Sequence, residues 1–289
     1  MHLCQIRTNY SDFFSYWSFL DNRVPEYSVY DVFGGRKLEE LLLNDVVEIA
    51  DIPDDFETTE RQYIDIQSFK DNQVNINKEA IKGFLNTLIY PLYFLDYETI
   101  FPAVPLYDNT RPYQQIPFQF SLHIQEKKGG DLKHDEFLYM EVSDPRPDFT
   151  KSLIENCGEI GSVVVYNQSF ESGINDQLAV DFPEYSERIN GITQRMIDLL
   201  VPFRSRWLYH PDMKGSASLK SVLPAFVPGL SYDNLAIGDG GTASLLYLSC
   251  IAGNVSENER IQIFQNLKDY CYQDTLAEVK LLKVLYDNV

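Results

Sequence analysis

The stretch PLYFLDYE, residues 91–98, decides the fold. It reads as a β-strand, in which successive side chains alternate between two faces. One predicted face carries Leu92, Phe94, Asp96 and Glu98. Two carboxylates therefore end an otherwise apolar row, and two anions beside a buried strand are costly unless a positive group neutralises them. The alternative, that the strand simply emerges into solvent at Asp96, stays open for this pair taken alone.

Short apolar runs alternate with amphipathic stretches after residue 90, which is typical of an α/β domain. Three consecutive strands, the last two joined across Gly129 and Gly130, predict an antiparallel meander. A further buried strand between helices predicts that the sheet is mixed and flanked by helices. The predicted strands are 91–98, 116–126, 134–142 and 161–166, and the predicted helices between and after the last two are 148–157 and 169–182.

A long C-terminal helix is predicted after a capping box formed by Ser256 and Glu259. On this helix Tyr270 and Asp274 are four residues apart and therefore stack on one face, beside an apolar stripe. An acid in that position calls for a partner. The alternative is a Tyr–Asp pair at the edge of the stripe with the carboxylate solvated.

A third acidic position, Glu171, follows the buried run VVVYNQSF, where a strand hands over to a helix. A carboxylate in the first turn of a helix is common, because it interacts favourably with the helix dipole. Each acidic position is weak evidence by itself. Taken together, the order of these acidic positions along the chain and their places on strands and helices are stronger evidence for a common site.

Length and composition predict one large domain with an appendage, because 289 residues exceed a typical domain of roughly 150 residues. We expect residues 1–86 to form a small, acidic, non-catalytic N-terminal appendage, marked by the run from Glu48 to Glu60. Residues 87–289 are expected to form the main domain. With Cys4 alone, the appendage cannot hold a four-cysteine iron–sulfur cluster.

Net charge and cysteine content limit the classes of protein to which this chain can belong. The 24 Lys and Arg against 43 Asp and Glu leave a formal charge of −19, which attracts cations and disfavours general nucleic-acid scaffolding. Four scattered cysteines without a C-x-x-C pair suggest neither disulfides nor a zinc knuckle, so we expect a cytoplasmic protein. The first 14 residues lack the plan of a signal peptide, and the longest apolar run is too short to cross a membrane.

Three motifs together resemble the tyrosine branch of the DEDD superfamily of 3′–5′ exonucleases. They are D-Y-E-T at residues 96–99, N-Q-S-F-E at residues 167–171 and Y-C-Y-Q-D at residues 270–274. The segments 196–203 and 216–226 also resemble elements before the third motif, and the stretch from 92 to 123 resembles a bacterial family, domain-of-unknown-function 2779. The resemblance covers roughly the last two-thirds of the chain and implies a ribonuclease-H-like fold.

The resemblance implies a two-metal mechanism with Mg²⁺ or Mn²⁺, hard cations that take oxygen ligands. The implied metal ligands are Asp96, Glu98, Glu171 and Asp274, and Tyr270 joins them as a catalytic residue that orients the attacking water. Asp96 would bridge both cations, and Glu171 would act mainly through a water. Glu171 departs from the family, which usually has aspartate here, so its reach is one methylene longer.

Substrate contacts are predicted from the motifs and from a basic segment. Residues 188–220 hold six basic and two acidic residues, a local charge of +4 that suits the backbone of a single strand. A solvated surface explains the same charges equally well, and Trp207 and Tyr209 would either stack bases or pack. The predicted substrate-binding residues are Thr99, Asn167, Lys220, Arg204 and Arg206.

The sequence thus favours a metal-dependent 3′–5′ exonuclease that releases nucleoside 5′-monophosphates from single-stranded DNA or RNA. Two alternatives stay open. One is a catalytically weak nucleic-acid-binding or regulatory domain, and the other is a structural domain that serves a nuclease partner. The resemblance also implies a possible further nuclease domain or subunit, because relatives of this kind often carry a RecB-like nuclease domain upstream.

Overall fold

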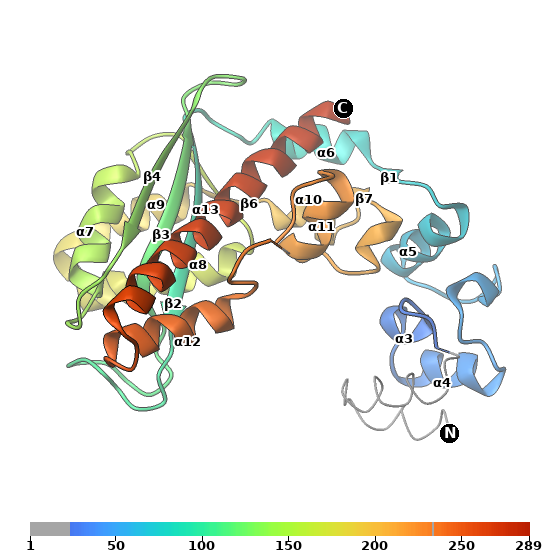
Figure 1. The fold of residues 1–289 in the computed structure, drawn as a ribbon. Helices are drawn as coiled ribbons and strands as arrows, with labels where there is room; N and C mark the ends of the chain where they lie inside the picture. Colours follow the sequence, from blue (N-terminus) through green and yellow to red (C-terminus); the bar gives the residue numbers. More distant parts are fainter. Residues whose placement is uncertain (1–23, 233) are drawn as a thin grey trace.

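A five-stranded mixed sheet forms the centre of the molecule (Figure 1). The computed structural model describes residues 24–232 and 234–289. The strand order is β4-β3-β2-β5-β6, with β2, β3 and β4 antiparallel and β5 and β6 parallel to β2. The strands are β2 (Leu92–Ile100), β3 (Ile116–Gln125), β4 (Leu132–Leu138), β5 (Ser162–Val165) and β6 (Met196–Asp198). The predicted α/β class, meander and mixed sheet are confirmed.

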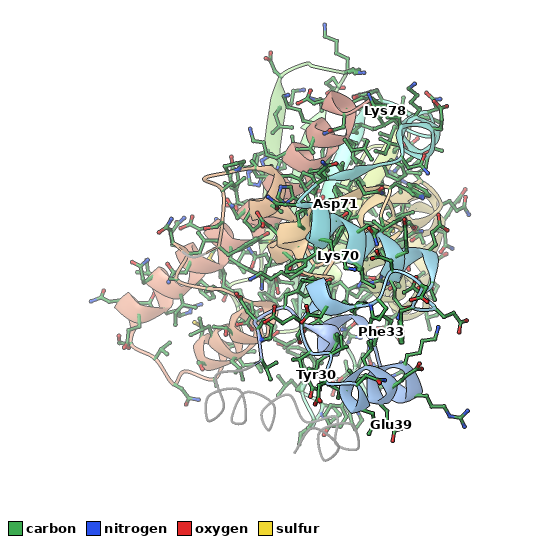
Figure 2. All side chains as sticks on the ribbon, turned by 90° about the vertical axis from the view of Figure 1, so that its right-hand side faces the viewer. Tyr30, Phe33, Glu39, Lys70, Asp71 and Lys78 are labelled. Carbon is green, nitrogen blue, oxygen red and sulfur yellow. The ribbon has the colours of Figure 1, made fainter. Side chains whose placement is uncertain are left out.

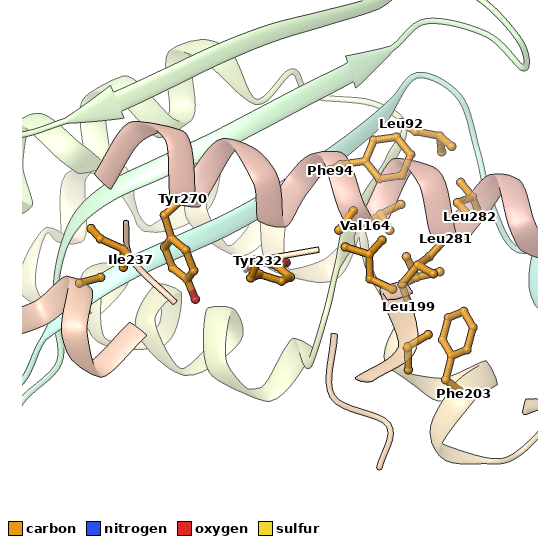
Figure 3. Packing of buried hydrophobic residues seen from close by; sticks show 14 of the residues in the cluster. Leu92, Phe94, Val164, Leu199, Phe203, Tyr232, Ile237, Tyr270, Leu281 and Leu282 are labelled. Carbon is orange, nitrogen blue, oxygen red and sulfur yellow. The ribbon is translucent and has the colours of Figure 1, made fainter. Parts of the chain in front are cut away.

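Helices cover both faces of this sheet. On one face lie α10 (Leu200–Arg204), α11 (Leu219–Phe226), α12 (Gly240–Ile251) and α13 (Glu257–Asp287), and on the other lie α7 (Arg146–Asn156), α8 (Gln168–Asp181) and α9 (Ser186–Gln194). Alternate side chains of β2 point into two apolar cores, one on each face of the sheet. Leu92 and Phe94 lie in the first core, and Tyr93 and Leu95 lie in the second. Figure 3 shows the first core beneath α13.

A glycine allows β5 to start beside β2. Gly161 has a φ of +89°, and a Cβ atom there would lie 2.1 Å from the carbonyl oxygen of Pro91. Only glycine adopts this backbone conformation at so close an approach without strain. The amide of Ser162 then donates to the carbonyl of Ile89, which sets the register of the two parallel strands.

Helix α13 crosses the sheet and is held there by buried polar contacts. It begins with the predicted capping box, in which Ser256 and Glu259 bond each other's backbone amides. The side-chain amide of Gln119 on β3 donates to the carbonyl oxygen of Leu267 at 2.9 Å. Thr275 Oγ1 lies 2.7 Å from Ser121 Oγ and is also bonded to a histidine of β3. These contacts fix both the rotation and the height of α13 over the sheet.

The N-terminal part forms a small helical lobe with its own apolar core, which contains Val29, Leu41 and Ile49. Figure 2 turns this side toward the viewer, with Tyr30 and Glu39 far from Lys78 along the lobe. The elements of the described N-terminal part are α3 (Val29–Val32), α4 (Gly35–Leu43), η1 (Ile49–Asp51), α5 (Glu60–Asp71), β1 (Asn75–Ile76) and α6 (Lys78–Leu85).

Contacts across residue 86 join this lobe to the main domain. Ile81 and Leu85 of α6 lie in the first core of the sheet, and β1 pairs with β7 (Leu208–Tyr209). Arg206 is fully buried and bonds both carboxylate oxygens of Asp65 on α5, at 2.5 and 3.0 Å. Residues on both sides of residue 86 therefore share one core, and the domain boundary expected there stays a prediction. Two 3₁₀ helices, η2 (Pro183–Tyr185) and η3 (Pro211–Met213), complete the described elements.

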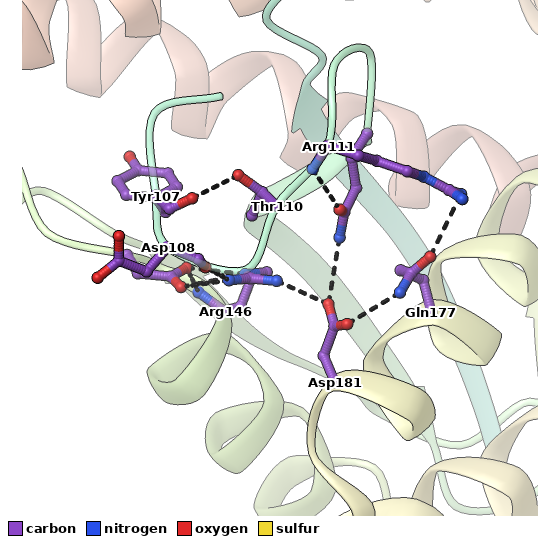
Figure 4. A network of polar contacts seen from close by, with 9 residues as sticks. Tyr107, Asp108, Thr110, Arg111, Arg146, Gln177 and Asp181 are labelled. Atoms are coloured by element: carbon purple, nitrogen blue, oxygen red, sulfur yellow. Dashed lines mark hydrogen bonds and ion pairs between the residues drawn. The ribbon is translucent and has the colours of Figure 1, made fainter. Parts of the chain in front are cut away.

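The loop from residue 101 to 115 is pinned to α7 and α8 by a polar network (Figure 4). Arg146 is buried and donates to Asp181 at 2.7 Å, to Asp144 at 2.6 Å and to the carbonyl of Asp108. Gln114 reaches the same oxygen of Asp181 from the loop. Because charge-assisted bonds of this kind are strong, the loop that follows β2 has a defined position beside α8.

Two sequence expectations concern residues outside those described, namely Cys4 and the stretch 1–14. The other three cysteines, Cys157, Cys250 and Cys271, are buried free thiols. Among the helices of the described ranges, none combines the length and the apolar character that crossing a membrane requires.

Candidate active site

Three acidic side chains converge where β2 passes beneath α13. Each of Asp96, Glu98 and Asp274 offers a carboxylate oxygen, and these oxygens all lie within 4.8 Å of one another. Asp96 and Glu98 come from the α13 side of β2, as the strand alternation predicted, and Asp274 comes from the middle of α13. Residues about 175 positions apart in the chain thus meet because one helix crosses one strand.

Neighbouring groups fix the positions of these acids. The Cys271 thiol, one turn from Asp274, lies 3.7 Å from the carboxylate of Asp96 and 3.8 Å from its backbone carbonyl. The hydroxyl of Tyr232 donates to Asp274 Oδ1 at 2.5 Å. Ser244 on α12 donates to the carbonyl of Thr99, where a β-bulge follows Glu98. Asp96 and Asp274 are therefore each contacted by a side chain from another element, and α12 holds the backbone beside Glu98.

Glu171 lies in the first turn of α8, as predicted, and approaches the site from the β5 side. Its side chain is only 1% exposed, and its Oε2 atom has no hydrogen-bond partner. Helix α8 is tied to β2 by the Tyr97 hydroxyl, which donates to Asn175 at 3.1 Å. Glu171 is not in the group whose oxygens lie within 4.8 Å, but its charge raises the pKa of Asp96.

A fifth acid, Glu278, was not predicted from the sequence. It follows Asp274 by one helical turn on α13 and is 1% exposed, with no hydrogen-bond partner at either carboxylate oxygen. Burial raises its pKa well above the usual range, and the charges of Asp96, Glu171 and Asp274 raise it further. The available signal was the spacing Tyr270, Asp274, Glu278, which puts all three side chains on one helix face.

Burial raises the pKa of every acid in this cluster, and the charges of neighbouring acids raise the pKa of Asp96, Glu98 and Glu278 further. Burial, followed by the charge of Asp274, raises the pKa of Glu98 to about 8, and burial raises that of Glu171 to about 8. The pKa of Asp96 is raised well above its usual range by burial and then by Asp274, Glu98 and Glu171. A group of buried carboxylates with raised pKa values is typical of a site that takes up protons or cations.

Lys220 and two tyrosines border the acids. The Lys220 ammonium lies 5.6 Å from the ring centroids of both Tyr232 and Tyr270, and its charge lowers the pKa of Glu98 and Asp274. Tyr270 is buried one turn before Asp274, and its ring projects from α13 toward Tyr232 in Figure 3. Burial and then the charge of Asp274 raise the pKa of Tyr270 far above its usual value, so the hydroxyl stays a hydrogen-bond donor.

The donor set fits hard divalent cations. Mg²⁺ and Mn²⁺ prefer carboxylate oxygens, and three such oxygens already converge. The unpartnered oxygens of Glu171 and Glu278 are costly in a buried position unless a proton or a cation satisfies them. The residues that would hold a cation are Asp96, Glu98 and Asp274, whose oxygens converge, with Glu171 acting on Asp96 through its charge.

The other predicted substrate contacts lie in different settings. Thr99 is buried at the end of β2 beside Glu98. Asn167 is exposed at the start of α8, and its backbone amide donates to Asp198 at 3.0 Å. Arg204 is half-exposed, with a guanidinium nitrogen 3.7 Å from the same Asp198. Their role toward a substrate stays a prediction.

Arg206 requires a correction. It was predicted as a substrate contact, but its side chain is completely buried and its guanidinium is used by Asp65 and by the carbonyl of Gly215. Tyr209 is also buried, so it packs and does not stack bases. The basic segment does not form one face, because Arg188 pairs with Glu159 and Lys214 pairs with Glu26.

Comparisons with known proteins agree with part of the sequence-based resemblance. Residues 93–218 match the family model described as "Domain of unknown function (DUF2779)". This range includes Asp96, Glu98 and Glu171 but not Tyr270 or Asp274. No solved structure matches the chain.

Curated relatives come from mycoplasmas. "Uncharacterized protein MG366" of Mycoplasma genitalium is 27% identical over 224 residues, which cover 71% of this chain and 33% of the relative. "Uncharacterized protein UU173" of Ureaplasma parvum is 27% identical over 232 residues, covering 73% of this chain and 33% of the relative. The chain thus spans about a third of the length of these relatives. Together, the family model and these relatives support the resemblance of this chain to the family described as "Domain of unknown function (DUF2779)".

Proposed function

We propose that this chain is a metal-dependent 3′–5′ exonuclease of the tyrosine DEDD type, with a ribonuclease-H-like fold. It would hydrolyse single-stranded DNA or RNA to nucleoside 5′-monophosphates. The observation that carries the proposal is the convergence of Asp96, Glu98 and Asp274 within 4.8 Å beneath Tyr270. The first and third motifs are far apart in sequence, and the fold brings their acids together on the α13 side of the central strand.

The sheet supports this proposal by its topology. Three antiparallel strands followed by two parallel ones, with the acidic strand in the middle, form the order β4-β3-β2-β5-β6. In open sheets with parallel strands, ligands bind at the carboxyl ends of the strands. Asp96 and Glu98 lie in the second half of β2, and Glu171 lies just after β5. The acids therefore lie where such a sheet usually binds its ligands.

In the proposed hydrolysis of a phosphodiester bond, each of these groups would have a different role. Bound divalent cations would supply an activated water and neutralise charge on the leaving oxygen. Tyr270 keeps its proton because burial and Asp274 raise its pKa, so its hydroxyl would donate to and orient the attacking water. Lys220, close to both tyrosine rings, would contact the phosphate.

A groove beside α8 is suited to the 3′-terminal nucleotides. It has a volume of about 290 Å³, and its lining includes Phe101, Arg111 and Tyr113 from the pinned loop and Gly173 of α8. Tyr113 is 70% exposed and Phe101 is 52% exposed. Exposed aromatic rings beside an arginine are a sequence-tolerant surface for stacked bases. The groove lies against the helix that carries Glu171.

Partners and compartment belong to the same proposal. A further nuclease domain or subunit would act with this one, as the sequence resemblance implies. The three described cysteines are reduced and buried, which suits a reducing compartment such as the cytoplasm.

The test uses 5′-labelled single strands of DNA and RNA with Mn²⁺, Mg²⁺ or EDTA. We expect metal-dependent shortening from the 3′ end with release of 5′-monophosphates, while circular and 3′-phosphorylated strands resist. Asp96→Asn should abolish cleavage, whereas the exposed Asp269→Asn on α13 should retain it. Cleavage of circular strands would replace the exonuclease with an endonuclease. Binding of single strands without any cleavage would favour the nucleic-acid-binding alternative.

A further inference from the structure

The feature that the four-acid site leaves unexplained is Glu278. It is 1% exposed in the middle of the protein, and neither of its carboxylate oxygens has a hydrogen-bond partner. A buried carboxylate without a partner is among the costliest groups that a fold can contain. A glutamate that served only for packing would be replaced at lower cost by leucine or methionine. Its position therefore calls for a ligand.

The fold directs Glu278 toward the site. Cys271, Asp274 and Glu278 follow one another at helical spacing on the buried face of α13, and Cys271 contacts Asp96. Along α13, Glu278 lies between Asp274 and Leu281. Figure 3 shows that Leu281 packs in the same cluster as Phe94 and Val164. The next turn of the same face thus lies over β2 and β5, the two strands that lead to Asp96 and Glu171.

The electrostatic surroundings agree with this geometry. Burial raises the pKa of Glu278 most, and the charges of Asp96, Glu171 and Asp274 raise it further. The backbone amide of Tyr166, just after β5, has the opposite effect and lowers the pKa of Glu278. Lys220 acts on Glu98 and Asp274 but is not among the main influences on Glu278. Glu171 also has a carboxylate oxygen, Oε2, that is buried without a hydrogen-bond partner.

We propose that Glu278 is a fifth carboxylate of the site and that, with Asp96 and Glu171, it holds a second divalent cation. The first cation would be held by Asp96, Glu98 and Asp274, whose oxygens already converge. This inference rests on the metal-binding part of the proposed function. It also gives Glu171 a role, because the glutamates of α8 and α13 would then share one cation with Asp96.

The experiment counts bound Mn²⁺ by electron paramagnetic resonance and calorimetry, without substrate, in wild type, Glu278→Gln and Glu278→Met. Wild type should bind two Mn²⁺ ions. Both variants should keep one ion at unchanged affinity and bind the second at least roughly tenfold more weakly. Without metal, both variants should melt at a higher temperature than wild type, because an unsatisfied buried acid has been removed. Asp269→Asn, exposed on the same helix, should behave as wild type in every measurement.

Two results would overturn the inference. One is a wild-type protein that binds fewer than two Mn²⁺ ions. The other is Glu278→Gln or Glu278→Met with two ions at wild-type affinities, which would make Glu278 a protonated core residue. Failure of the proposed function is separate, since a protein that binds two ions through Glu278 but cleaves no nucleic acid keeps this inference and loses the exonuclease.

Discussion

The side chain of Glu171 reaches one methylene further than the aspartate that the resemblance leads one to expect at this position. Its helix is fixed by the bond between Tyr97 and Asn175, so the backbone of α8 does not follow a shorter side chain. Glu171→Asp should therefore lower kcat/KM for single-strand cleavage roughly 10–100-fold, and Glu171→Gln should lower it further. Asp176→Asn, exposed on the same helix, is the matched control. Wild-type rates in both Glu171 variants would remove this residue from the site.

Tyr270 tests whether a hydroxyl takes part in the reaction. Tyr270→Phe keeps the ring that packs near Tyr232, with centroids 6.0 Å apart, and removes only the donor. We expect cleavage to slow by roughly 10²–10⁴-fold, the range for a lost positioning or proton-transfer group, with Mn²⁺ binding and single-strand binding unchanged. Steady-state kinetics combined with a binding titration separate the two effects. Full activity of the variant would end the proposed role of the tyrosine.

The raised pKa values of the acids set the pH dependence of stability. Between about pH 4 and about pH 8 the unfolded chain ionises these carboxyl groups, while the metal-free folded protein retains protons on Glu98 and Glu171. The folded state then binds more protons than the unfolded state, so the free energy of unfolding falls as pH rises through this window. Melting temperatures in EDTA should decrease accordingly. The double variant Glu98→Gln with Glu171→Gln should show a shallower decrease, and an equal slope would contradict the assignment.

At the scale of elements, the junction between α5 and the main domain depends on one buried ion pair. Asp65→Asn would leave the Arg206 guanidinium buried with one charged partner removed. Breaking such a pair from one side usually costs about 3–5 kcal/mol of unfolding free energy. Urea unfolding should show that loss, whereas Asp71→Asn, exposed on the same helix, should change little. A cost below about 1 kcal/mol would mean that the pair does not hold the lobe.

Most elements of the sheet were predictable because their signals are local. The alternation in residues 91–98, the glycines at 129–130 and the capping box at Ser256 each determine structure over a few residues. The buried face of α13 was predicted less well. The apolar Ile261 near the start of α13 is 60% exposed, while the acidic Glu278 is buried. Hydrophobic periodicity cannot detect a buried acid, because the pattern counts such a residue as polar.

The same limit explains what was missed in the site. Asp96, Glu98 and Asp274 were predicted as one site from the resemblance of their motifs to a known superfamily, and the structure brings them together. Tyr232 lies in a segment without regular structure, and only tertiary packing brings its hydroxyl to Asp274. Arg206 was misassigned for the opposite reason. An arginine in a basic segment looks exposed until its partner, 141 residues earlier, is known.

At the scale of the whole molecule, metal binding should stabilise the fold. At the proposed site, cations would bind the folded protein and not the unfolded chain, so Mn²⁺ at 100 times its dissociation constant should add about 2.7 kcal/mol to the free energy of unfolding. Differential scanning calorimetry with and without Mn²⁺ measures the shift in Tm. Asp96→Asn should remove most of that shift. An unchanged Tm at millimolar Mn²⁺ would contradict a cation site at these acids.

The crossing of α13 over β2 also has a consequence during synthesis on the ribosome. The contact between Cys271 and Asp96 spans 175 residues of chain. At the usual rates of translation, on the order of 10–35 s pass between the synthesis of the first acidic motif and that of the helix that completes it. Throughout this interval the nascent chain carries Asp96 and Glu98, and later also Glu171, without Asp274, Glu278 or Tyr270. If the proposed function holds, the nascent chain is therefore inactive toward nearby messenger RNA until α13 has left the exit tunnel and docked on the sheet.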